Sequence, residues 1–254
     1  MNFEDETSSS ELVPNIMDLQ ALFIDMDDTL VSYREPVRAG LNAVRKTISE
    51  LNETGVDQLE KDFMELLSES IPLLINKEIS YRDDVRVRMK KILNRYGHNT
   101  TEEEIVQYDK LYWKTFWKNR KPLPEAMDLL KLCNNLHIPV AIISNGNPEM
   151  QHKTMSRLKL HNYVNIVLTP ENVDEMKPSN TLFERAMKIL GVNPVKIIMV
   201  GNSFSRDVIG AVNAGIIPVW LNSLGKEKPE DVNVVEITSF TELLERLQLG
   251  GDIQ

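Results

Sequence analysis

Polar residues that could bind phosphate or a metal ion follow four short apolar runs of this chain. In chain order these residues are Asp25, Asp27 and Thr29, then Ser144, Asn145 and Gly146, then Lys177, then Asn202 and Asp207. Carboxylate and amide oxygens are ligands for hard cations, and ammonium and hydroxyl groups can donate to phosphoryl oxygens. The four sets together therefore indicate phosphate or metal chemistry.

The apolar runs that precede these residues predict buried parallel strands. They are short and rich in branched side chains, and they lie at 21–24, 140–143, 166–168, 197–200 and 217–221. Continuous apolar runs of this kind are typical of strands covered on both faces. Helical patterns separate the later runs, so we expect an α/β fold with a Rossmann-like, doubly wound parallel sheet. Ligands of such sheets bind beyond the carboxyl ends of the strands, where the polar sets lie.

The segment 35–119 breaks this alternation, because only helical periodicity is found there. Three apolar stripes at spacings of three and four begin at Val37, Val85 and Ile105. We therefore expect an all-helical domain at 35–119, inserted into a core made of 19–34 and 120–254. Residues 1–18 are acidic and predict a flexible tail.

Composition sets limits on the class of protein. The chain has 254 residues, a formal net charge of −9 and 42% hydrophobic residues, which suits a globular protein with a sizeable core. The acidic balance argues against a nucleic-acid partner. The single cysteine, Cys133, favours a reducing, cytoplasmic location. No apolar run is long enough for a transmembrane helix, so no membrane partner is expected, and the sequence leaves the oligomeric state open.

The four polar sets resemble the motifs of the haloacid dehalogenase (HAD) superfamily. Its first motif, Asp-x-Asp-x-Thr after an apolar strand, matches Asp25 to Thr29, and its second matches Ser144-Asn145-Gly146. Its third, a lysine often followed by proline, matches Lys177-Pro178, and its fourth matches the segment 200–207. The resemblance covers about 19–34 and 120–248, and the helical insertion is similar to a C1-type cap.

The resemblance implies a phosphatase of a small phosphorylated metabolite, such as a nucleotide, a sugar phosphate or phosphoglycolate. Asp25 would be the nucleophile that forms an aspartyl-phosphate, and Asp27 would be the general acid and base. The implied Mg²⁺ ligands are Asp25, the Asp27 carbonyl, Asn202 and Asp207, and Lys177 would supply positive charge. The implied substrate-binding residues are Thr29, Ser144, Asn145, Gly146 and Lys177. Because dehalogenases of the superfamily usually lack the second aspartate, Asp27 favours phosphatase chemistry.

One position departs from the family pattern. Asn202 stands where the family usually has an acid, and an amide oxygen ligates Mg²⁺ without contributing charge. We therefore expect weaker metal binding. Two alternatives stay open: a catalytically weak or inactive binding protein on the same fold, and a sugar phosphomutase.

Overall fold

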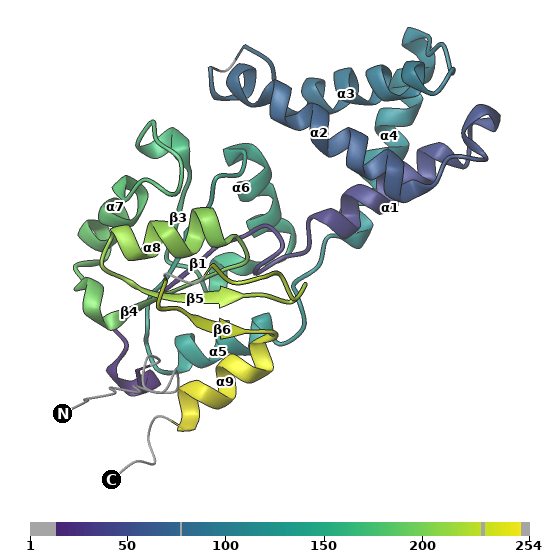
Figure 1. Cartoon of the computed structure of the whole chain (residues 1–254). Coiled ribbons are helices and arrows are strands. Elements are labelled where there is room, and N and C mark those ends of the chain that lie inside the picture. Colours follow the sequence, from purple (N-terminus) through teal and green to yellow (C-terminus); the bar gives the residue numbers. More distant parts are fainter. Residues whose placement is uncertain (1–13, 77, 230–231, 250–254) are drawn as a thin grey trace. The chain divides into compact units, whose positions relative to one another are not determined.

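The computed structural model describes residues 14–76, 78–229 and 232–249 (Figure 1). The chain divides into two compact units. One unit comprises Met1–Val31 and Pro122–Gln254, and the other is Ser32–Lys121, which contains the segment predicted to be the helical insertion.

The first unit is built on a six-stranded parallel sheet in the order β3-β2-β1-β4-β5-β6. The strands are β1 (Ala21–Ile24), β2 (Val140–Ile143), β3 (Ile166–Leu168), β4 (Ile197–Gly201), β5 (Ile217–Leu221) and β6 (Val235–Ile237). This order is that of a Rossmann-like sheet, whose ligands bind where the strand order reverses, between β1 and β4. The predicted fold class is thereby confirmed.

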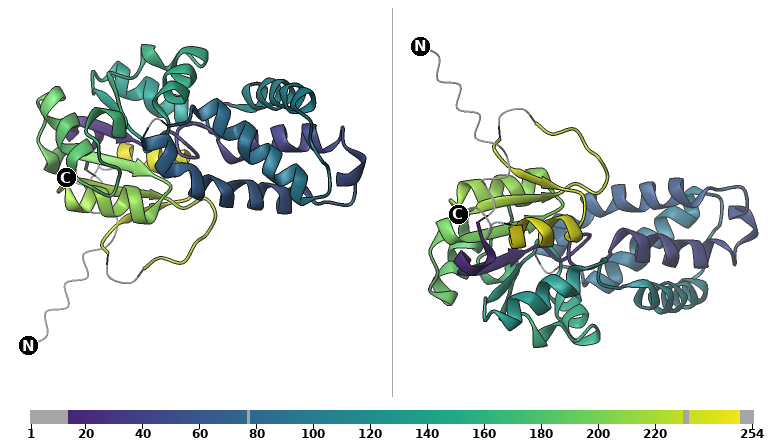
Figure 2. Two further views of the ribbon diagram at one scale, coloured as in Figure 1. Left: turned by 90° about the horizontal axis from the view of Figure 1, so that it is seen from above. Right: turned by 90° about the horizontal axis from the view of Figure 1, so that it is seen from below.

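Helices cover both faces of the sheet, as Figures 1 and 2 show. These helices are α5 (Ala126–Asn135), α6 (Pro148–Arg157), α7 (Thr181–Leu190), α8 (Ile209–Asn213) and α9 (Phe240–Leu249). Leu22 and Ile24 pack on the side of α5 and α9, and Ala21 and Phe23 pack on the side of α7 and α8. All four are fully buried, which explains why β1 is a continuous apolar run rather than an alternating one.

The single cysteine belongs to the core on the α5 side. Cys133 is buried in α5, and burial raises the pKa of its thiol to about 12. This placement agrees with the apolar spacing of α5 and leaves the thiol without reactive character.

The edge strand β6 was not predicted, because Glu236 in its middle leaves no continuous apolar run. It pairs with β5 from Val219 onward, whereas Pro218 pairs only with Met199 of β4. The proline therefore lies in the part of β5 that has a single neighbouring strand, where its missing N–H is tolerated.

The second unit is helical in its described residues. Its helices are α1 (Arg34–Arg45), α2 (Val56–Ile75), α3 (Tyr81–Arg95) and α4 (Glu102–Asn119). The predicted stripes are the packed faces, since Val37, Val85 and Ile105 are all buried. Helix α1 packs closely on α4 because Gly40 has no side chain: a Cβ there would lie 2.6 Å from Cδ2 of Tyr112.

The residues just before β1 differ from the predicted flexible tail. Residues 1–13 lie outside the described residues, but Ile16–Asp18 form a short 3-10 helix that is capped by the side chain of Asn15. Ile16 is 6% exposed and packs in the core with Leu19. The predicted flexible tail of residues 1–18 is therefore wrong at its end, because an apolar side chain there is buried.

No helix within the described ranges is both long enough and apolar enough to cross a membrane.

Candidate functional site

The residues that follow β1 form a tight loop that fixes the Asp25 side chain. The loop is closed by hydrogen bonds from the Leu30 N–H to the Asp25 carbonyl (3.3 Å) and from the Val31 N–H to the Met26 carbonyl (2.9 Å). The Thr29 hydroxyl donates to Asp25 Oδ2 (3.2 Å) and accepts from the Asn202 N–H (3.0 Å). Thr29 therefore ties the first polar set to the fourth.

Lys177 lies at the centre of the site and is almost fully buried. Its ammonium group donates to Asp25 Oδ1 (2.7 Å), Asp207 Oδ1 (2.6 Å) and the carbonyl of Ile143 (2.5 Å). These contacts use all three of its hydrogens. Burial alone would lower the pKa of Lys177, but the two carboxylates more than offset it and raise the pKa above the ordinary value.

Asp25 and Asp207 are two buried carboxylates that share this one cation. They are 7% and 2% exposed. Burial raises the pKa of Asp25 to about 7; the charges of Asp207 and Asp27 add to this rise, and Lys177 opposes it. The site therefore carries more negative charge than its lysine neutralises.

Asp207 reaches the site from a wide helical turn, Phe204–Val208, that follows β4. Its Oδ2 accepts from the Ser203 N–H (2.9 Å). A Cβ on Gly201 would lie 2.3 Å from Cβ of Asp207, so the glycine is required for this approach.

In the second polar set, Ser144 and Asn145 make different kinds of contact. Ser144 is 1% exposed and its hydroxyl oxygen accepts from the Gly146 N–H (3.0 Å). The side chain of Asn145, by contrast, is bonded to the backbone of Lys177 on both sides: Oδ1 accepts from its N–H (2.8 Å) and Nδ2 donates to its carbonyl (3.0 Å). The Asn145 side chain thus positions the lysine, and the role in substrate binding that the family resemblance implies for Asn145 stays a prediction.

Gln151 of α6 is a member of the site that the sequence reasoning missed. Its Nε2 donates to Asp27 Oδ2 (2.7 Å) and to Ser144 Oγ (3.1 Å). The available signal was a polar residue on the buried face of a helix, because Met150, Thr154 and Met155 are buried on the same face.

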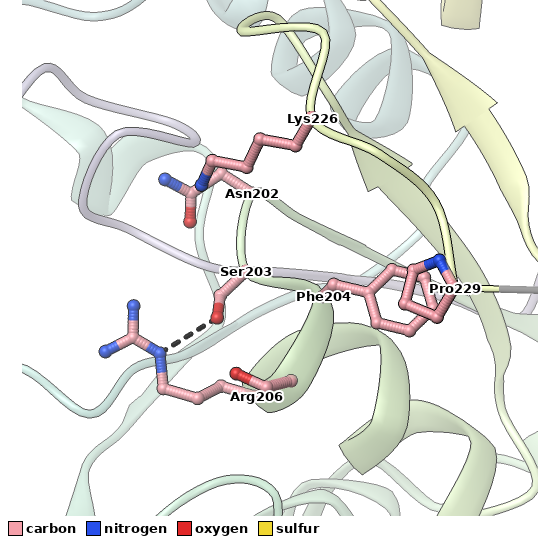
Figure 3. A pocket seen from close by; sticks show the side chains of 7 residues that line it. Asn202, Ser203, Phe204, Arg206, Lys226 and Pro229 are labelled. Atoms are coloured by element: carbon pink, nitrogen blue, oxygen red, sulfur yellow. Dashed lines mark hydrogen bonds between the residues drawn. The ribbon is translucent and has the colours of Figure 1, made fainter.

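A hollow of about 340 Å³ adjoins the fourth set (Figure 3). Its lining residues are Asn202, Ser203, Phe204, Ser205, Arg206, Lys226 and Pro229. Arg206 Nε donates to Ser203 Oγ (3.0 Å), and Lys226 extends toward Asn202 from the other side. The described lining contains these two cations and no Asp or Glu, so the hollow is basic although the whole chain is acidic.

The side chains present suit a hard divalent cation. Within the part of the chain that the structure describes, no group of three or more His, Cys, Asp or Glu side chains could hold a metal ion. A cation here would therefore depend on the Asn202 amide and on backbone oxygen as well as on Asp25 and Asp207. The donors are all oxygen, and their excess negative charge favours a hard cation such as Mg²⁺.

A family model described as "Hydrolase: haloacid dehalogenase-like hydrolase" matches residues 19–215. The chain belongs to this family.

Curated relatives place the chain among the phosphatases of the HAD family. It is 27% identical over 213 residues to the glyceraldehyde 3-phosphate phosphatase of Methanothermobacter thermautotrophicus, covering 84% of this chain and 90% of the relative. It is 32% identical over 128 residues to the pyrimidine 5′-nucleotidase YjjG of Escherichia coli, covering 50% of this chain and 56% of the relative. These matches confirm the predicted phosphatase branch.

Solved structures of the HAD family share the fold. The 2-haloacid dehalogenase of Pseudomonas syringae pv. Tomato superimposes with a TM-score of 0.61 at 23% identity, covering 90% of this chain and 98% of that chain. At this level of identity the likeness concerns the fold alone.

Proposed function

We propose that the protein is a Mg²⁺-dependent phosphatase that hydrolyses a small phosphomonoester through an aspartyl-phosphate on Asp25. The observation that carries this proposal is the second carboxylate, Asp27, which a hydrogen bond from Gln151 holds beside Ser144. An alkoxide leaving group needs a proton, which a carboxyl group can supply, whereas a departing halide does not. Asp27 therefore distinguishes phosphate ester cleavage from dehalogenation.

The residues Asp25, Asp207 and Asn202, with the backbone carbonyl of Asp27, would hold the Mg²⁺ ion. When bound, the ion would neutralise the carboxylates and the phosphate, which otherwise repel each other.

The reaction has two steps. In the first, a carboxylate oxygen of Asp25 forms a bond to phosphorus, the bond from phosphorus to the ester oxygen breaks, and Asp27 gives its proton to that oxygen. In the second, Asp27 takes a proton from water, the water oxygen bonds to phosphorus, and the bond from phosphorus to the Asp25 oxygen breaks, which releases phosphate and the free Asp25 carboxylate. The Ser144 hydroxyl and nearby backbone N–H groups, including that of Gly146, would donate to the phosphoryl oxygens as charge develops on them. Lys177 holds the Asp25 carboxylate in place.

The relatives and the basic hollow support a small phosphorylated compound as the substrate. A nucleotide, a sugar phosphate or a phosphoglycolate-type compound fits the named activities of the matched phosphatases, which include phosphoglycolate phosphatase of Neisseria meningitidis. The helical unit would serve as a C1-type cap that closes over such a substrate and excludes water. We place the enzyme in the cytoplasm, because a single cysteine excludes a disulfide framework within the chain, as is typical of proteins in reducing compartments.

A second candidate is a weak or inactive binding protein, which Asn202 favours because it lacks the usual charge. A sugar phosphomutase would instead use the same Asp25 to transfer phosphate within a sugar. Detection of an isomerised sugar phosphate rather than free phosphate would distinguish the mutase from the phosphatase.

The deciding experiment measures phosphate release from a panel of nucleotides, sugar phosphates and phosphoglycolate, with Mg²⁺ and with EDTA. Asp25→Asn should lower kcat at least about a thousandfold, because the amide is not a nucleophile. Asp28→Asn is the matched control in the same loop: Asp28 has φ of 58°, a left-handed conformation that asparagine also adopts, and its activity should stay near that of the wild type. Absence of metal-dependent release from the folded wild type would favour the binding protein.

A further inference from the structure

Gln151 connects two groups that the proposed reaction needs. The side chain is 1% exposed, and its amide nitrogen lies 2.7 Å from Asp27 Oδ2 and 3.1 Å from Ser144 Oγ. A primary amide nitrogen has two hydrogens, so one hydrogen serves each acceptor. Because the side chain is buried, contact with solvent does not explain why a polar amide lies at this position.

The contact with Ser144 fixes the direction in which its hydroxyl can donate. Ser144 Oγ accepts from Gln151 Nε2 and from the Gly146 N–H (3.0 Å). A hydroxyl oxygen has two lone pairs, and these two donors occupy both. The hydroxyl hydrogen must then point away from both donors, which leaves Ser144 as a donor to a third group such as a phosphoryl oxygen.

The contact with Asp27 fixes the orientation of the second carboxylate. Asp27 is half-buried, and a hydrogen bond to Oδ2 restricts rotation of its carboxyl group. The reverse orientation of the amide would place Gln151 Oε1 against a carboxylate oxygen, which is repulsive. The orientation seen instead leaves Oε1 buried without a partner among the described residues. A buried oxygen without a hydrogen-bond partner is costly, so its presence favours a functional reason for this amide.

Gly146 leaves space for the Gln151 amide because it has no side chain. A Cβ on Gly146 would lie 1.9 Å from Gln151 Nε2 and 2.9 Å from Asp27 Oδ2. Any other residue at 146 would therefore displace the amide from both acceptors.

We infer that Gln151 is a positioning residue that aims the Asp27 carboxyl group at the leaving oxygen and the Ser144 hydroxyl at the phosphoryl group. This inference rests on the proposed phosphatase function. It predicts that loss of the amide harms the reaction most when the leaving group depends on a proton.

The test compares kcat/KM for two substrates, p-nitrophenyl phosphate and an unactivated alkyl phosphate, in Gln151→Met and Gln151→Glu. Both variants preserve the length of the side chain, and neither donates from that position at neutral pH. Because kcat/KM reports the step in which the leaving group departs, we expect a loss of about a hundredfold for the alkyl phosphate and about threefold for p-nitrophenyl phosphate. When Asp27 is already replaced in Asp27→Asn, adding Gln151→Met should lower kcat/KM by only about threefold, and by the same factor for both substrates.

His152→Leu, at the exposed next position of α6, is the control and should behave as the wild type. An equal loss for both substrates in a variant that melts like the wild type would overturn the inference, as would full activity of Gln151→Glu. Should Gln151→Met fail to fold, Gln151→Asn keeps an amide that is one methylene too short and must show the same substrate dependence. Failure of the wild type to release phosphate from either substrate would instead refute the proposed function.

Discussion

At the scale of single residues, the site is governed by an imbalance of charge around Lys177. Two buried carboxylates, Asp25 and Asp207, share one ammonium group, and Asp27 lies at the same strand end. Removing charges from water is costly unless they are compensated. The protein therefore has a site in which a divalent cation would relieve repulsion as well as assist catalysis.

This imbalance predicts how stability depends on pH when Mg²⁺ is removed with EDTA. Burial, with help from Asp207 and Asp27 and against Lys177, raises the pKa of Asp25 from 3.8 to about 7. Between these values the folded protein holds a proton that the unfolded chain has lost, so the free energy of unfolding should fall as pH rises from about 4 to about 7. Denaturant titrations of the wild type and of Asp25→Asn would measure this, and the variant should lack that part of the slope. An identical slope in both proteins would contradict the assignment.

The neutral amide at Asn202 predicts a gain from restoring the charge. Asn202→Asp should lower the Mg²⁺ concentration for half-maximal binding by about tenfold, because ligand charge raises the affinity for a hard cation. Calorimetric titration with Mg²⁺ would measure the affinity directly. Unchanged or weaker binding would show that residue 202 does not ligate the ion.

The sequence located the main groups of the site but not their orientation. Asp25, Lys177 and Asp207 could be predicted because each follows an apolar run and carries recognisable chemistry. Gln151 could not, since its importance depends on which face of α6 is buried. The task of Asn145 depended on a contact with the backbone of Lys177, 32 residues away along the chain, which no local pattern encodes.

At the scale of elements, the approach of α1 to α4 depends on one glycine. Gly40→Ala should destabilise the helical unit by about 1–3 kcal/mol, because the added Cβ would lie 2.6 Å from the Tyr112 ring. Gly55→Ala is the control, since nothing lies within 4 Å of the corresponding Cβ, and its effect should stay below about 1 kcal/mol. Urea denaturation of both variants would test this, and equal stabilities would show that the helices can move apart at no cost.

The sequence predicted elements well where an apolar run or stripe was continuous, and poorly where polar residues interrupted it. The five apolar runs are strands β1 to β5, and the helical stripes are packed faces. Strand β6 and the short helix at Ile16–Asp18 were missed because a polar residue in each, Glu236 and Asp18, leaves no continuous apolar run.

At the scale of the whole molecule, the helical unit interrupts the sheet unit at a single point. Val31 and Pro122 form an antiparallel bridge, and the Leu123 N–H donates to the Leu30 carbonyl (3.0 Å). The two ends of the sheet unit are therefore adjacent where the insertion leaves and returns.

This adjacency predicts that the sheet unit folds without the helical unit. Replacement of residues 32–121 by a Gly/Ser linker of about four residues should give a protein that melts cooperatively, because the bridge already brings the ends together. Circular dichroism during heating would follow the melting. A protein that lacks a cooperative transition would show that the helical unit is needed for folding of the core.

The burial of Cys133 has a practical consequence for observing this protein. Since the chain's only thiol is enclosed in the core and has a pKa of about 12, alkylating dyes should leave the native protein unlabelled. A cysteine placed at exposed Glu103 and another at exposed Lys188 would then be the sole attachment points for a donor and an acceptor fluorophore, one on each unit. Energy transfer between such dyes would report the separation of the two units during turnover, with no need to remove a native cysteine first.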